Sequence, residues 1–292
     1  MFSLSTAAAA AAVVVAVSVG TTQCAPPAAT PLPGATPTVG TSTGPNPGAT
    51  GSTGATSGSL AIYYIGHNNR LYREFHPLAA GDGSVAAKVR AAVTEMLDGL
   101  TAYDPDYHSG WPASAAVRNV TVSGTTITVD LSGAAVNGDD PPTESAALQQ
   151  LIWTATAAVP NSVMRLLLDG KPVTKLWNLL PASGDLHRGN WLDVQAFIQV
   201  IDPQQNATVG RTFTAKIDGS AFEATAVVQI KNAAGAVVTM QSIQVGSLAV
   251  PNRATASVTF TLDPGRYTIE GFVYSAKDSS VQQLDDHTFT VK

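Results

Sequence analysis

The sequence predicts two folded domains of different class, an α+β domain over residues 60–178 and an all-β sandwich over residues 191–292. In the first domain, apolar residues recur at spacings of two in some segments and of three and four in others, which indicates both strands and helices. In the second domain the spacing is two throughout and turns interrupt it at short intervals, as in a sandwich. The length of 292 residues fits two domains of common size.

The charge of the chain excludes several classes of protein. The 16 Lys and Arg and the 21 Asp and Glu all lie after residue 59, and the net charge is -5. A mildly acidic chain without a basic block offers no surface for phosphate groups, so we expect no nucleic-acid partner. One cysteine allows neither an internal disulfide nor a Cys-rich zinc site. The five histidines lack metal-binding spacing, so we expect no metal and no cofactor.

Residues 1–24 are predicted to be an export signal. Ala7 to Val19 is an almost unbroken apolar run, with the length of a signal-peptide core. Cys24 follows closely, where a bacterial lipoprotein carries its acylated cysteine, although residues 21–23 depart from the usual lipobox. We therefore expect Cys24 to be lipidated. The alternative is a signal that is cleaved nearby without lipidation.

Residues 25–59 are predicted to be a disordered tether. All but three of these residues are Ala, Pro, Thr, Gly or Ser. Such a composition buries too little apolar surface to offset the entropy of ordering the chain. The prolines favour extended conformations, so the segment can hold the domains at a distance from a membrane.

The first domain is expected to begin with two short strands and to continue with alternating helices and strands. Asp82 or Ser84 is the expected N-cap of its first helix. Two helices on one face of a small mixed sheet make an α+β layer. The expected elements are strands at 61–65 and 70–76, a helix at 85–100, a hairpin at 120–131, a helix at 143–159 and a strand at 164–168.

The second domain follows a predicted linker at 179–190 and shows no helical pattern. Asp263, Gly265 and Tyr267 fit a tyrosine corner, in which the tyrosine hydroxyl binds nearby backbone. The alternative is an exposed tyrosine after a turn. The expected strands lie at 196–200, 213–217, 227–230, 237–240, 257–262, 267–274 and 287–291.

Short segments of both domains resemble a known pair of domains. In the first domain these are residues 62–65, 95–100, 110–112, 126–132, 148–157 and 166–173, and with them it resembles the GerMN domain of bacterial spore-germination and sporulation proteins. In the second they are residues 198–203, 219–224 and 275–279, which resemble the immunoglobulin-like domain that accompanies GerMN in spore-germination proteins.

The resemblance implies an extracytoplasmic, lipid-anchored protein of the cell envelope, or a secreted one if Cys24 is not acylated. Its expected role is spore germination or sporulation, or a related role in a non-sporulating host. Because no catalytic signature occurs in the sequence, we expect a protein that is not an enzyme and that binds other envelope proteins.

The segment 103–112 leaves two alternatives open. Tyr103, Asp104, Asp106, Tyr107 and Trp111 are candidate ligand-binding residues, since aromatic rings can stack on sugars while carboxylates bind sugar hydroxyls. This predicts a module that binds cell-wall polysaccharide. Equally, Trp111 can pack against the following hairpin. A third hypothesis makes Asp104 and Asp106 the acid and base of a hydrolase, although a loop spacing does not set their separation.

Overall fold

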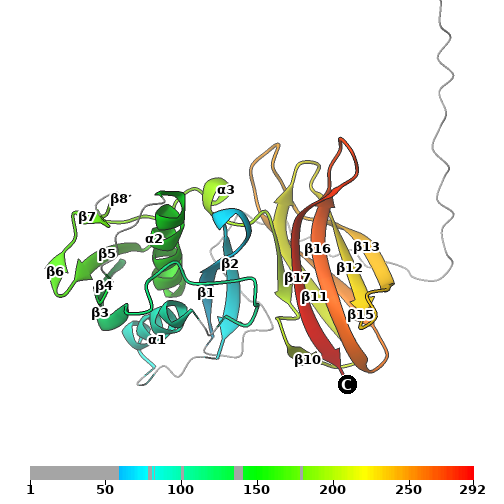
Figure 1. Cartoon of the computed structure of the whole chain (residues 1–292), viewed down its shortest axis with the longest axis horizontal. Coiled ribbons are helices and arrows are strands. Elements are labelled where there is room, and N and C mark those ends of the chain that lie inside the picture. The colour runs from blue at the N-terminus through cyan, green and yellow to red at the C-terminus, as the bar shows by residue number, and fades with distance from the viewer. Residues whose placement is uncertain (1–58, 78–80, 82, 100–101, 135–140, 178–179) are drawn as a thin grey trace, which may run out of the picture. The chain divides into compact units, whose positions relative to one another are not determined.

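The computed structural model describes residues 59–77, 81, 83–99, 102–134, 141–177 and 180–292 (Figure 1). The predicted signal with Cys24, nearly all of the predicted tether and Asp82 lie outside the described residues. All described residues belong to one compact unit. Within it, buried apolar side chains form two cores, one drawn from residues 62–196 and the other from residues 198–291. The fold is therefore multidomain, with an α+β domain followed by an all-β domain.

The first domain opens with an antiparallel ribbon of β1 (Leu60–Ile65) and β2 (Leu71–His76), joined through the short helix η1 (His67–Asn69). The helix α1 (Val85–Asp98) follows. Ser84 caps it, because the Ser84 hydroxyl accepts the Ala87 N–H at 3.1 Å, and Gly99 ends it in the left-handed region.

A four-stranded mixed sheet completes the frame of this domain. Its strands are β3 (Ala116–Ser123), β4 (Thr126–Ser132), β5 (Val163–Leu168) and β6 (Lys171–Pro172), and β4 and β5 run parallel. The helix α2 (Pro141–Ala155) and the short helix η2 (Thr156–Ala158) connect β4 to β5. In Figure 1, α1 and α2 lie between the ribbon and this sheet, so the ribbon is a separate layer.

Residues 180–190, which we expected to be an interdomain linker, pack on the first core. Leu186 pairs with Met164 through two backbone hydrogen bonds, and the Arg188 side chain donates to Thr156 Oγ1 at 2.8 Å. The strand β8 (Leu180–Pro181), at the start of this stretch, pairs with β7 (Lys175–Leu176), and the helix α3 (Trp191–Val194) follows the stretch. The first core consequently extends to Ala196.

The second domain is a sandwich of two sheets. One sheet has the order β10-β17-β16-β12-β13; in the other, β11 pairs with β14, β15 and β9. Tyr267 Oη donates to the Asp263 carbonyl at 2.9 Å, and a side chain at Gly265 would lie only 3.3 Å from the Tyr267 ring. The strands are β9 (Ile198–Asp202), β10 (Ala207–Val209), β11 (Thr212–Ala221), β12 (Thr225–Asn232), β13 (Val237–Gln244), β14 (Gly246–Ser247), β15 (Ala254–Thr261), β16 (Gly265–Tyr274) and β17 (Val281–Val291).

Within the part of the chain that the structure describes, no helix has the length and apolarity needed to cross a membrane.

Candidate functional site

Glu74 on β2 anchors the start of the loop that holds the predicted ligand-binding residues. Its carboxylate is buried and accepts the backbone N–H groups of Tyr103 and Asp104, both at 2.9 Å. His76 lies beside it, with Nε2 2.7 Å from Glu74 and Nδ1 3.0 Å from Glu95 on α1. Burial alone would lower the pKa of His76, but the hydrogen bonds to these two carboxylates raise it. The Tyr103 ring stacks on the His76 ring, with centroids 3.9 Å apart.

Asp104 and Asp106 point to different environments. Asp104 is 4% exposed and its Oδ1 accepts the Asp106 N–H at 2.8 Å, whereas the Asp106 side chain is exposed. A glycoside hydrolase of the usual type needs two carboxylates that flank the scissile bond. This pair instead forms a local turn, in which one carboxylate holds the backbone of the other.

Tyr107 and Trp111 are both buried. The Tyr107 ring stacks on Tyr72 with centroids 4.8 Å apart, and a side chain at Gly66 would lie 2.7 Å from Tyr72, so only glycine permits this stack. Trp111 is 5% exposed, donates from Nε1 to the Ala147 carbonyl at 2.9 Å and packs on Trp177. Neither ring is presented at the surface as a platform for a sugar.

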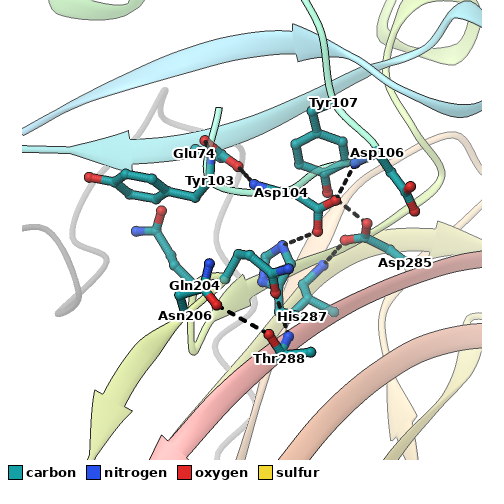
Figure 2. Close-up of polar contacts among 12 residues, drawn as sticks. Glu74, Tyr103, Asp104, Asp106, Tyr107, Gln204, Asn206, Asp285, His287 and Thr288 are labelled. Atoms are coloured by element: carbon teal, nitrogen blue, oxygen red, sulfur yellow. Dashed lines mark hydrogen bonds and ion pairs between the residues drawn. The ribbon is translucent and has the colours of Figure 1, made fainter. Parts of the chain in front are cut away.

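The loop is part of a polar contact between the two domains, which we call the interdomain seam. It consists of the contacts that residues 71–76 and 104–107 make with residues 199–204, 218, 285 and 287. Figure 2 shows Asp104 and Tyr107 facing Asp285 and His287 of β17. Tyr107 Oη donates to Asp285 Oδ1 at 2.6 Å, and Gln204 exchanges hydrogen bonds with the Phe75 backbone.

Asp285 is a buried carboxylate of the seam. Besides the Tyr107 hydroxyl, it accepts the Val200 N–H at 2.6 Å. Burial raises its pKa to about 7, despite these two donors. Burial also raises the pKa of Asp104 to about 6. Burial together with Asp285 holds the pKa of Tyr107 well above its ordinary value. The seam thus holds two carboxyl groups that ionise closer to neutral pH than free aspartates.

Asp218 on β11 joins the domains through charge. It accepts from Arg253 at 2.7 Å and from Thr255 at 2.9 Å, and it lies 3.2 Å from Arg73 of the first domain. Burial would raise the pKa of this carboxyl, but the two guanidinium groups outweigh burial and lower it. The seam therefore has an ion cluster in addition to the Asp285 network.

The second domain has an exposed apolar face that the sequence reasoning missed. An open depression of about 300 Å³ is lined there by Glu223, Thr225, Val227, Met240, Gln241, Ser242 and Tyr274. Met240 is 55% exposed and Tyr274 is 50% exposed. The Tyr274 ring stands edge-on against the buried ring of Phe272, 5.2 Å away. The sequence did contain a signal for this face, the three consecutive apolar residues at 272–274. A strand with one solvent-exposed face is expected to alternate apolar and polar residues.

A second open depression, of about 560 Å³, is polar. Its lining includes Lys231, Arg266, Glu270 and Asp286. Neither depression includes a residue of the segment 103–112. In the described ranges, no three His, Cys, Asp or Glu side chains are grouped so that they could hold a metal ion.

Comparisons with known proteins match the two domains separately. Residues 61–174 match the Germane family, described as "Sporulation and spore germination", and residues 197–280 match Gmad2, described as "Immunoglobulin-like domain of bacterial spore germination". A search of curated proteins found no match.

Two solved structures come from one Bacillus subtilis protein. The first GerMN domain of the sporulation protein GerM is 20% identical, with a TM-score of 0.35, over 45% of this chain and 98% of that chain. The tandem GerMN domains of GerM are 17% identical, with a TM-score of 0.36, over 70% of this chain and 61% of that chain.

Proposed function

Because the chain joins a sporulation and spore germination domain to an immunoglobulin-like domain of bacterial spore germination, we propose that it is an exported envelope protein that binds another envelope protein. In this proposal Cys24 is acylated and residues 25–59 tether the folded domains to the membrane. The domains bind a partner and catalyse no reaction.

The observation that carries the proposal is the exposed face around Met240 and Tyr274. Large apolar side chains that stay half exposed on a folded domain mark a surface that gains free energy when a partner covers it. Tyrosine and methionine are enriched at the centre of protein interfaces. Val227 lies on the lining of the same depression and extends the apolar surface inward.

The chemistry of the depression indicates the kind of partner. Its apolar residues are flanked by Thr225, Gln241 and Ser242, which offer hydrogen-bonding groups, and Glu223 supplies the one charge in the lining. A volume of about 300 Å³ is at the small end for a ligand pocket. The occupant that fits is a protein surface that inserts one apolar side chain between its own polar groups.

The two alternatives from the sequence find less support. Sugar stacking by Trp111 requires an accessible ring, and this ring is buried between α2 and Trp177. Hydrolysis by Asp104 and Asp106 requires a cleft between them, and their arrangement is a closed turn. We therefore keep protein binding as the proposed function.

Site-specific photo-crosslinking in cells tests the contact face. A crosslinking residue is placed at Met240, at Tyr274 and, as a matched control, at Val250, which is 72% exposed and outside the depression. We expect one envelope protein to be captured from both Met240 and Tyr274 and not from Val250. Adding Thr225→Arg, an exposed change that fills the depression, should abolish the adduct. Equal capture from all three positions, or capture from none, would contradict the proposal.

Mass spectrometry of the mature N-terminus tests the tether. We expect the membrane fraction to contain a chain that begins at an acylated Cys24. An unmodified N-terminus beyond residue 24 in every fraction would remove the anchor from the proposal and leave the contact face untouched.

A further inference from the structure

His287 of the second domain and Asp104 of the first domain face each other across the interdomain seam, and no hydrogen bond joins them. His287 Nδ1 lies 2.9 Å from the Pro203 carbonyl, which can only accept, so the hydrogen of the neutral ring is on Nδ1. His287 Nε2 has no hydrogen-bond partner among the described residues and lies 3.8 Å from Asp104 Oδ2. The His287 side chain is 1% exposed.

Asp104 has the complementary arrangement. Its Oδ1 is occupied by the Asp106 N–H, which leaves Oδ2 facing the His287 ring. If no proton is shared, a carboxylate charge faces a nitrogen lone pair, with both groups removed from water, and this is costly. One added proton either neutralises Asp104 or makes His287 a cation 3.8 Å from the carboxylate. In both cases the buried charge is compensated.

We propose that Asp104 and His287 form a proton-operated latch, which holds the two domains together when either member of the pair carries the added proton and weakens their docking when that proton leaves. The two residues belong to different domains, so the protonation energy of the pair acts directly on docking. The latch goes beyond the proposed partner binding and does not depend on it.

The neighbouring charged groups reinforce the need for this proton. Asp285 lies on the same strand as His287 and is held by Tyr107, which stacks on Tyr72. From the first domain, Asp106 and Glu74 flank Asp104, and their own partners are His67 at 3.9 Å and His76 at 2.7 Å. Asp286 follows Asp285 and faces Glu270 and Lys231 on the outer side. Several carboxyl groups therefore lie near Asp104, whereas the guanidinium groups of the seam pair with Asp218.

The direction of the pH effect follows from the docked pKa. Burial raises the pKa of Asp104 from 3.8 to about 6, although the Asp106 N–H and His287 act to lower it. A carboxyl group with a raised pKa stabilises the docked state fully below the free pKa, and this contribution is lost as pH rises through the docked pKa. The shift predicts an unfolding equilibrium constant that increases roughly 30-fold between pH 4.5 and pH 7.5 through Asp104 alone. Asp285, with its pKa raised to about 7, adds to the effect in the same direction.

The test compares the full chain with two asparagine variants by urea unfolding between pH 4.5 and pH 7.5. Asp104→Asn mimics the protonated acid, because the side chain keeps its shape and carries neither a charge nor a titrating proton. Asp106→Asn is the matched control, since Asp106 belongs to the same loop and its side chain is 60% exposed. In Asp104→Asn we expect the roughly 30-fold change of the unfolding equilibrium constant that is due to Asp104 to disappear. We also expect this variant to be more stable than the wild type at pH 7.5. Asp106→Asn should keep the wild-type pH dependence.

An equal pH dependence in the wild type and in Asp104→Asn overturns the latch, as does a wild type that gains stability towards pH 7.5. NMR of the wild type gives a second test that does not require a folded variant. The latch predicts that the Asp104 carboxyl carbon titrates well above the range of a free aspartate. A carboxyl carbon that titrates in the range of a free aspartate overturns the proposal.

Discussion

Asp218 is the residue whose replacement should expose the coupling between the domains. Its carboxylate faces Arg73 of the first domain and Arg253 of the second, and it is 6% exposed. Asp218→Asn keeps the shape of the side chain and removes its charge. The two guanidinium groups then remain near the seam without their counter-ion.

The expected cost is about 3–5 kcal/mol of unfolding free energy, the usual range when one member of a buried ion pair is removed. We expect a cost near the lower end of this range, because the Arg73 side chain is 21% exposed and stays in contact with water. A loss of about 3 kcal/mol lowers the melting temperature of a chain of this size by roughly 6–12 °C.

Tryptophan fluorescence during urea unfolding is a suitable assay in a Trp191→Phe background, because the Trp191 ring lies 5.4 Å from the guanidinium group of Arg253 in the second domain. The other three tryptophans are buried in the first core, whereas Asp218 lies on β11 of the second domain. In this background a change at Asp218 can move the fluorescence midpoint only through the contacts between the two domains. We expect the midpoint to fall together with the far-ultraviolet circular dichroism signal.

Asp263→Asn provides the matched control. Asp263 also pairs with an arginine, Arg211, but its side chain is 84% exposed. Exposed ion pairs contribute about 0–1 kcal/mol, so the midpoint should hardly move. An unchanged fluorescence midpoint for Asp218→Asn, with earlier unfolding seen only by circular dichroism, would refute the coupling.

Three further predictions concern individual residues. Trp111→Ala removes a buried ring and should cost roughly 3–5 kcal/mol by urea unfolding; loss of binding to purified cell wall at unchanged stability would contradict its packing role. Tyr267→Phe removes the hydrogen bond to the Asp263 carbonyl and should cost about 1 kcal/mol, read from the circular dichroism midpoint; an unchanged midpoint would show that the bond is not stabilising. Cys24→Ser should move the protein from the membrane to the soluble fraction, and retention of the variant on membranes would argue for another anchor.

Local periodicity predicted the longer helices and strands of both domains, because each of them buries one face in its own core. It did not predict the short elements β6, β7, β8, α3, β10 and β14. The stripe of α1, with Val89, Val93, Met96 and Leu97 buried, is visible at spacings of three and four. The hairpin of β3 and β4 is visible from alternation around Ser123 and Gly124. The packing of the predicted linker on the first core was not predicted, because Leu186 pairs with Met164 of β5 and a local pattern cannot show a contact between separate segments.

The interdomain seam was not predicted, because its partners lie about 180 residues apart in the chain. Tyr107 and Asp104 read locally as a polar loop, whereas both are buried and Tyr107 reaches Asp285 of the second domain. One local signal was present. Asp285, His287, Phe289 and Val291 occupy every second position of β17 and are all buried. A carboxylate and an imidazole therefore lie on the apolar side of this strand. Charged groups on an apolar strand face need partners, and this pattern indicates a buried polar contact.

The central structural claim is that the two domains form one unit through this seam. Residual dipolar couplings of the full chain, measured on backbone amides at pH 5, test it most directly. We predict that amides of residues 60–196 and of residues 198–291 fit a single alignment tensor. Two tensors of different magnitude or orientation would show that the domains move independently, and this result would contradict the claim.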